Sequence, residues 1–322
     1  MITLQKVHGS SNQFFILDLD QLSFTPLDEQ IVALTQQITS SFLTGADGLL
    51  VVSKSNYADC LGKMRVINAD GSEASMCGNG LRTVARYLSE KFRQSEFKVE
   101  TLNANLTVRK QSDLTQNVTA FGVEISPIHF NNKYFPFNNL NTTKLIKSPI
   151  KAFSDNLNFY AIAVPNPHLI SFVEKDDDLN ETLETLGTKL NQPNDYFPDG
   201  VNVNFAKILG ENELFVRTFE RGVGFTNACG TGMSATSLAY MLHQNRNAFP
   251  SDEITVYNPG GVVKTIVHED WIELIGNATH THTITISENQ LFNHQFTEAT
   301  VNQTNEQQSY EHFIANLKKQ AD

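Results

Sequence analysis

The stretch Cys77-Gly78-Asn79-Gly80 recurs later in the chain as Cys229-Gly230-Thr231-Gly232. The two copies are separated by close to half of the 322 residues. A motif repeated at that distance predicts an internally duplicated protein in which each half carries one half-site.

Each copy leads into a helical pattern of apolar residues. The periodic positions are Leu81, Val84, Ala85 and Leu88 after the first copy, and Met233, Ala235, Leu238, Ala239 and Leu242 after the second. Both cysteines are therefore expected at helix N-termini, where free backbone N–H groups and the helix dipole favour an anion. Such a position lowers the pKa of a thiol below its ordinary value of about 8.5 and can also bind a small carboxylate.

A single Cys-Gly-X-Gly sequence is weak, because most such cysteines are small buried residues at a turn. Two copies, each opening a helix, favour a chemistry that places two thiols at one carbon atom. The sequence therefore predicts a poised thiol and an anion-binding site in each half.

Composition excludes several classes of partner. A net charge of −11, with no basic patch, argues against nucleic acid and against an anionic membrane. Hydrophobic residues make up 40% and charged residues 18% of the chain, as in ordinary globular proteins. Three cysteines form neither a disulfide framework nor a zinc pattern, so we expect a reduced, cytoplasmic protein with no metal site.

Alternating apolar residues predict strands over residues 2–8, 13–19, 48–52, 64–68, 97–109 and 117–125, with a helix over 27–42. In the second half, 158–164 is expected to be a strand that ends in the turn Pro165-Asn166-Pro167-His168, and 213–221 a strand that leads to Cys229. Residues 270–288 read as a strand, and 305–319 as a terminal amphipathic helix whose apolar face packs on its own domain or on the partner in a homodimer.

Longer motifs resemble the diaminopimelate epimerase family. They are Asn68-Ala69-Asp70-Gly71-Ser72-Glu73, Met76-Cys77-Gly78-Asn79-Gly80, Pro165-Asn166-Pro167-His168, Val201-Asn202-Val203, Glu220-Arg221-Gly222 and Ala228-Cys229-Gly230-Thr231-Gly232, in that family's order. The resemblance implies an α/β fold of two pseudo-symmetric domains, each a curled, mostly antiparallel sheet around a central helix, with the active site in the cleft between them. It implies one domain of residues 1–125 completed by 282–322, and a second of 126–281.

The resemblance further implies conversion of LL-2,6-diaminopimelate to the meso form, for lysine and peptidoglycan synthesis, without pyridoxal phosphate or another cofactor. Cys77 and Cys229 would be the acid/base pair, with His168 beside Cys77 and Glu220 beside Cys229. The reacting carboxylate would be bound by Gly78, Asn79, Gly230 and Thr231. The distal amino acid end of this small-molecule substrate would be held by Asn12, Asn68, Asn166, Asn202 and Arg221.

The chain departs from the family pattern in three places. The family's His-Gly-Leu-Gly-Asn-Asp appears as His8-Gly9-Ser10-Ser11-Asn12-Gln13, Phe225 stands where Glu is common, and the chain continues beyond about residue 290. Two alternatives therefore stay open: a racemase of another amino acid, such as histidine or proline, and a non-catalytic binding protein of the same fold. Retention of both cysteines speaks against the second of these.

Overall fold

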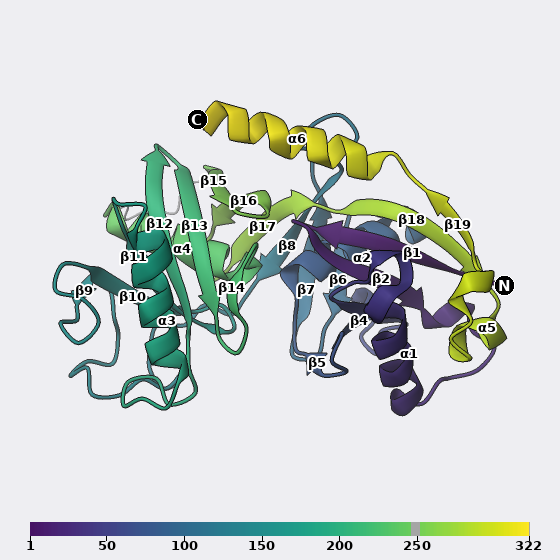
Figure 1. The fold of residues 1–322 in the computed structure, drawn as a ribbon, viewed down its shortest axis with the longest axis horizontal. Helices are drawn as coiled ribbons and strands as arrows, with labels where there is room; N and C mark the ends of the chain where they lie inside the picture. The colour runs from purple at the N-terminus through teal and green to yellow at the C-terminus, as the bar shows by residue number, and fades with distance from the viewer. Residues whose placement is uncertain (246–251, 322) are drawn as a thin grey trace. The chain divides into compact units, whose positions relative to one another are not determined.

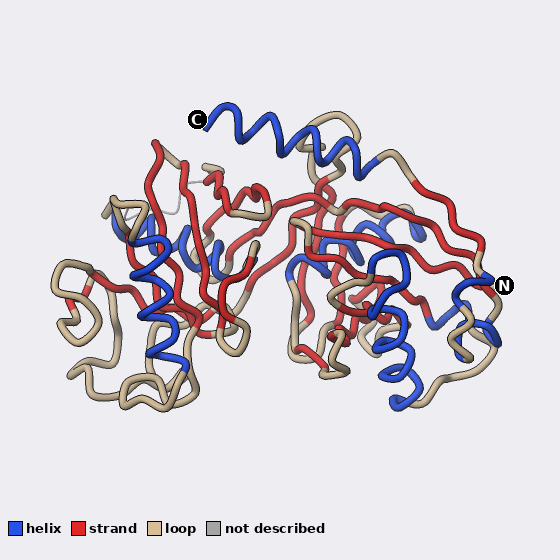
Figure 2. The backbone as a smooth tube through the Cα atoms, viewed as in Figure 1, coloured by secondary structure: helices blue, strands red, loops and turns tan. Residues whose placement is uncertain are grey.

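The computed structural model describes residues 1–245 and 252–321 (Figure 1). The chain divides into two compact units, one formed by Met1–Val123 with Ile275–Asp322 and the other by Glu124–Leu274. The sequence had placed these boundaries at 125/126 and 281/282. Both units contain strands and helices (Figure 2).

The first unit contains a mixed sheet. Its strands are β1 (Ile2–Gly9), β2 (Asn12–Asp18), β3 (Gly48–Ser53), β4 (Cys60–Asn68), β5 (Glu73–Ala74), β6 (Glu96–Glu100), β7 (Asn105–Lys110), β8 (Ala120–Ile125), β18 (Thr279–Ile286) and β19 (Thr300–Gln303). From β1 through β2, β3, β4 and β6 to β7, the successive pairings are antiparallel, parallel, antiparallel, parallel and antiparallel. At the other side of β1, β18 pairs antiparallel with β1 and with β19.

The second unit repeats this order of pairings. Its strands are β9 (Ser148–Pro149), β10 (Asn158–Ala163), β11 (Pro167–Phe172), β12 (Asn202–Gly210), β13 (Glu213–Glu220), β14 (Gly224–Thr226), β15 (Ile254–Asn258) and β16 (Gly261–Val267), and β17 (Ile272–Asn277) runs across the boundary. From β10 through β11, β12, β13 and β15 to β16, the pairings are again antiparallel, parallel, antiparallel, parallel and antiparallel. The predicted duplicated α/β fold is confirmed.

Each sheet wraps around one helix that follows the cysteine motif. Helix α2 (Gly78–Phe92) contacts β1, β2, β3, β4 and β7, and helix α4 (Gly230–His243) contacts β10, β11, β12, β13, β15 and β16. In α4 every residue from Gly232 to Met241 is buried. A helix buried on all its faces can be accommodated only where strands surround it, as a curled sheet does.

A second helix covers the outer side of each sheet. Helix α1 (Asp28–Ser41) buries Ile31, Leu34 and Ile38 in a core with Phe15 and Leu49. Helix α3 (Leu183–Asn191) follows a short π-helical segment (Asp178–Thr182) and buries Leu183, Leu186 and Leu190 in a core rich in phenylalanine. The remaining helices are 3-10 turns at Leu19–Gln21, Phe42–Thr44 and Phe296–Glu298, with α5 (Glu288–Phe292) and α6 (Glu306–Ala321) near the C-terminus.

The structure corrects two sequence predictions. Pro167 and His168 are not in the turn: they begin strand β11, which returns antiparallel along β10, so that only residues 164–166 reverse the chain. Pro167 can start this strand because its missing N–H is tolerated at a strand end. Residues 270–288 form two strands, β17 and β18, which are separated at Ala278. Within the described residues no helix is long and apolar enough to cross a bilayer.

Tight packing of α3 on β13 provides a test of this fold. A Cβ added at Gly187 would lie 2.4 Å from Cγ of Phe219, so Gly187→Ala should lower the free energy of unfolding by about 1–3 kcal/mol through overpacking. Urea denaturation measures this loss. Gly210→Ala is the matched control, because its Cβ would come no closer than 3.4 Å to any neighbour, and it should change stability by less than about 0.5 kcal/mol. Equal losses in both variants would contradict the packing described here.

Candidate functional site

Cys77 is the N-cap of α2, as the sequence predicts. Its backbone is extended, with φ −141°, and its Sγ accepts a hydrogen bond of 3.4 Å from the N–H of Gly80. The backbone carbonyl of Cys77 accepts the first hydrogen bond of the helix, from the N–H of Leu81. The N–H groups of Gly78 and Asn79 therefore lie in the first turn, where no helical carbonyl precedes them, and they are available to an anion.

Asn12 lies directly beside the sulfur of Cys77. Its Oδ1 accepts from the Cys77 thiol at 3.6 Å and from Nδ2 of Asn79 at 3.5 Å. Asp47 fixes the amide, since its Oδ2 accepts from Asn12 Nδ2 at 2.6 Å. The sequence analysis expects Asn12 at the distal end of the substrate, whereas the structure places its side chain against the Cys77 sulfur.

Asn68, the last residue of β4, stands at the turn that precedes Cys77. Its Nδ2 donates to Ser72 Oγ at 3.0 Å, and its backbone N–H donates to the Ser72 carbonyl. Ser72 in turn is held by Oδ1 of Asp70. The motif from Asn68 to Ser72 is therefore a turn closed by its own polar side chains.

Cys229 is the N-cap of α4 and is 7% exposed. Its Sγ lies 3.6 Å from Oγ1 of Thr231. The glycine at position 232 is required by space: a Cβ there would lie 2.4 Å from Oδ1 of Asn204 and 3.2 Å from the Cys229 sulfur. The repeated Cys-Gly-X-Gly pattern thus has a steric reason in this half of the chain.

The Cys229 thiol is held in its protonated form. Burial raises the pKa of Cys229 far above its ordinary value, and the negative charge of Glu220 raises it further. Glu220 is itself oriented by Thr226, whose hydroxyl donates to Glu220 Oε1 at 2.7 Å. The sequence expected Glu220 beside Cys229, and these interactions place it there.

His168 is fully buried, and both of its ring nitrogens are occupied. Nδ1 lies 3.0 Å from Nδ2 of Asn204, which can only donate, so Nδ1 is the acceptor and the ring hydrogen is on Nε2. That Nε2–H donates to Oδ1 of Asn166 at 3.0 Å. Burial lowers the pKa of His168 to about 3, so the ring is neutral and orients Asn166.

Asn202 forms hydrogen bonds to the motif that contains Pro167 and to the motif that contains Arg221. Its Nδ2 donates to the Pro167 carbonyl at 3.0 Å, and its Oδ1 accepts from the Arg221 N–H at 2.9 Å. The side chain of Arg221 is exposed and donates through Nη1 to the Asp199 carbonyl at 3.0 Å. Cys229, His168, Asn166, Asn202, Glu220 and Arg221 all belong to the second unit, and Asn12, Asn68, Cys77 and Asn79 to the first.

Two contributors were missed by sequence reasoning. Asn204 bonds His168 and also accepts from the hydroxyl of Thr218 at 2.8 Å. The sequence could have indicated Asn204, because it lies two residues after Asn202 in a strand and alternate residues of a strand share a face. Asp47, which holds Asn12, had no comparable signal, since it is brought there by the parallel pairing of β2 with β3.

The structure locates the two departures from the family pattern at Phe225 and at Ser10-Ser11. Phe225 pairs with Phe219 and packs on its ring and on Arg217, on the face of β13 opposite Thr218 and Glu220. Ser10 and Ser11 both have positive φ, 52° and 65°, in the turn between β1 and β2. Phe225 therefore belongs to the outer core and not to the surroundings of Cys229.

Comparison with known proteins identifies the family. The family model described as "Diaminopimelate epimerase" matches residues 4–122 and 160–281. The chain belongs to the diaminopimelate epimerase family. Proteins of that name from Enterococcus faecalis and Lactiplantibacillus plantarum are each 48% identical to it, over 98% and 99% of this chain and the same shares of their own.

Solved structures share the fold at low identity. A phenazine biosynthesis protein of the PhzF family from Bacillus anthracis has a TM-score of 0.63 at 17% identity, covering 88% of this chain and 97% of its own. A hydroxyproline epimerase from Agrobacterium vitis has a TM-score of 0.55 at 14% identity, covering 87% and 89%. At these identities the likeness concerns the fold alone.

Removal of the negative charge at residue 220 tests the environment of Cys229. Glu220→Gln should lower the pKa of the Cys229 thiol by about one unit, because a like charge no longer opposes the thiolate. The pH dependence of the Cys229 Cβ chemical shift, in protein with isotope-labelled cysteine, measures it. Glu213→Gln removes a charge from the other end of the same strand and should leave that pKa unchanged; the same shift in both variants would show that net charge alone is responsible.

Proposed function

We propose that the chain is a diaminopimelate epimerase that interconverts LL-2,6-diaminopimelate and meso-diaminopimelate by inverting one α-carbon. The observation that carries the proposal is the pair of half-sites, each with a cysteine capping a buried helix, in a chain matched by that family's model over both halves. Relatives named for this activity, with near-complete coverage, support the substrate.

The proposed chemistry is a two-base proton exchange. One sulfur, as a thiolate, takes the α-proton, and the other, as a thiol, delivers a proton to the opposite face of the resulting carbanion. We assign the donor role to Cys229, because burial raises the pKa of its thiol, and the role of the base to Cys77. After inversion Cys77 carries the proton and Cys229 the negative charge, so the reverse reaction uses the two groups in exchanged roles.

Backbone N–H groups stabilise the carbanion in place of a cofactor. The first turns of α2 and α4 offer the N–H groups of Gly78, Asn79, Gly230 and Thr231 to the carboxylate on the reacting carbon. These donors are held in position before the substrate binds, so they stabilise negative charge as it develops without reorganisation. We infer that the reaction needs no pyridoxal phosphate.

The polar side chains around the motifs hold the other amino acid end. Arg221 has a guanidinium with donors left beyond its bond to Asp199, and it suits a carboxylate. Asn68, Asn166 and Asn202 supply amide groups for the distal amine and carboxylate, and Asn12 is positioned by Asp47 at the Cys77 sulfur. His168 acts as a neutral orienting group through Asn166, and burial together with the charge of Glu220 keeps Cys229 protonated.

A racemase of another amino acid is the less favoured candidate. The sequence feature that favoured this candidate is Phe225, which stands where the family commonly has Glu. Its side chain packs in the outer core beside Phe219 and Arg217. Its replacement of Glu therefore does not alter the surroundings of Cys229. We place the activity in the cytoplasm, in the formation of meso-diaminopimelate for lysine and peptidoglycan.

Proton exchange in deuterated water tests the proposal. With LL-diaminopimelate, NMR should show deuterium entering the α-position together with formation of the meso isomer. Cys77→Ser and Cys229→Ser should each reduce stereoinversion by at least about 1,000-fold, because a hydroxyl is a far weaker acid than a thiol. Cys60→Ser is the matched control and should retain activity. Exchange with L-histidine or L-proline and none with diaminopimelate would overturn the substrate assignment.

A further inference from the structure

Asn277, the last residue of β17, is a fully buried amide in the first unit. Its Oδ1 accepts a hydrogen bond of 2.8 Å from the N–H of Ser10. Because a backbone N–H can only donate, this bond fixes which way the amide points. On the other side, Nδ2 donates to the His8 carbonyl at 3.2 Å and to Oγ1 of Thr279 at 2.8 Å. One side chain thus holds the end of β1 and the turn that follows it.

Arg82 binds the same turn from α2. Its Nη2 donates to Ser10 Oγ at 3.1 Å, and its Nε donates to the backbone carbonyl of Asn277 at 3.1 Å. Arg82, Asn277 and Ser10 are each no more than 1% exposed. Since water is excluded, these bonds are stronger than bonds of the same length at the surface.

The backbone of the turn needs such support. Ser10 and Ser11 have φ values of 52° and 65°, both in the left-handed region. A side chain disfavours this region, so two successive residues other than glycine persist in it only where the surrounding contacts hold them. The bonds from Asn277 and Arg82 to Ser10 are such contacts.

The turn is packed directly against the first turn of α2. A Cβ at Gly9 would lie 2.8 Å from the carbonyl oxygen of Asn79 and 2.9 Å from Nη2 of Arg82. Real Cβ atoms do not approach so closely, so only glycine lets β1 come this near to the helix. Asn79 is the second residue of α2, and Cys77 is its N-cap. The turn is therefore fixed relative to the helix end that carries the cysteine.

Asn12 begins β2 immediately after this turn. Its Oδ1 lies 3.6 Å from the sulfur of Cys77. An amide oxygen can only accept, so the two atoms form a hydrogen bond only when the sulfur carries a hydrogen, and the contact favours the thiol. In the proposed reaction Cys77 gains the α-proton, so this bond forms as the proton arrives.

We propose that Asn277 is a positioning residue for Cys77: together with Arg82 it holds the turn between β1 and β2 against α2, so that Asn12 presents its Oδ1 to the sulfur. The inference rests on the proposed role of Cys77 as the base. It gives a task to the Ser10-Ser11 turn, where the chain departs from the family pattern.

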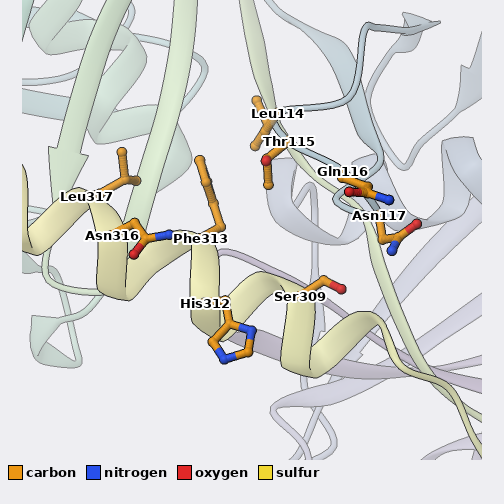
Figure 3. Close-up of a pocket in the computed structure, with 9 residues that line it drawn as sticks. All are labelled: Leu114, Thr115, Gln116, Asn117, Ser309, His312, Phe313, Asn316 and Leu317. Carbon is orange, nitrogen blue, oxygen red and sulfur yellow. The ribbon is translucent and has the colours of Figure 1, made fainter.

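The C-terminal helix covers the segment that leads into this turn. Tyr310 of α6 is 3% exposed, and its ring meets that of His8 edge-on with centroids 4.8 Å apart. Burial lowers the pKa of His8 to about 4, so the ring is neutral and its Nδ1 accepts from the Ser11 N–H at 3.3 Å. Phe313, further along the same helix, instead lines a groove with Leu114 (Figure 3).

Site-resolved alkylation tests the proposal. The full chain is treated with iodoacetamide at one pH near neutrality, and the rates at Cys77 and Cys229 are measured by mass spectrometry of their peptides. Asn12→Ala should raise the rate at Cys77 by at least about threefold, because a bond that favours the thiol is lost. Asn277→Ala should give a similar rise although Asn12 is still present. The rate at Cys229, in the other unit, should stay the same in both variants.

A double-mutant cycle distinguishes positioning from general loosening of the unit. In an Asn12→Ala background, Asn277→Ala should change the Cys77 rate by less than about 1.5-fold, because the group that it positions is absent. Thr101→Val is the matched control: Thr101 is buried in the same unit, and its hydroxyl donates to the Ala104 carbonyl at 2.8 Å, between β6 and β7. This variant should leave the Cys77 rate unchanged.

Three results overturn the proposal. They are an unchanged Cys77 rate in folded Asn277→Ala protein, effects of the Asn12 and Asn277 variants that multiply in the double variant, and an equal rise in Thr101→Val. If Asn277→Ala does not fold, Asn277→Asp decides. It keeps the shape and the acceptor for Ser10 but loses the amide donor to the His8 carbonyl, so it should also raise the Cys77 rate, and an unchanged rate overturns the proposal.

Alkylation reports the surroundings of Cys77 without turnover, so it separates the positioning role from the proposed function. Coupled effects of the Asn12 and Asn277 variants, with no epimerisation by the native chain, would remove the proposed function and leave the positioning role. Epimerisation by the native chain with an unchanged Cys77 rate in Asn277→Ala would do the reverse.

Discussion

The structure depends on the burial of a whole helix in the hollow of a curled sheet, once in each unit. The first N–H groups of α2 and α4 have no carbonyl partner within their own helix, and strands surround both helices. At α2 the Cys77 sulfur takes one of them, from Gly80. The carboxylate-binding role proposed for the other first-turn N–H groups therefore depends on this fold.

Enclosure also restricts which residues the helices can contain. In α4 the buried hydroxyls of Ser234, Thr236 and Ser237 each donate to the carbonyl four residues earlier, at 2.7–3.0 Å. They therefore carry no unsatisfied polar group into the core. In α2 the corresponding enclosed polar residue is Arg82, whose charge cannot be satisfied within its own helix. The two central helices of one repeated topology therefore bury different polar groups: hydroxyls bonded within α4, and in α2 a guanidinium bonded to Asn277 and Ser10.

Much of the fold followed from local patterns. The strands at β1, β2 and β3, the helix α1 and the caps at Cys77 and Cys229 were predicted within a few residues, because apolar periodicity and capping are properties of neighbours in sequence. The start of β11 was misplaced, since two prolines around Asn166 suggest a longer turn than the hairpin needs. Helix α3 was missed in a polar stretch whose apolar face is identified only by the core that it covers.

For the candidate site, too, some features follow from the local sequence and others from tertiary contacts. The sequence by itself determined the two cysteines, the glycines beside them and the polar motifs, because each depends on a short run of backbone and its hydrogen bonds. Only the tertiary structure decided which groups ionise. Asn277 reaches Arg82 from 195 positions away, Tyr310 comes from the last helix, and Asp47 arrives through a strand pairing. The pKa of a group depends on how much water is removed around it and on which charges remain, and both are set by contacts between distant segments.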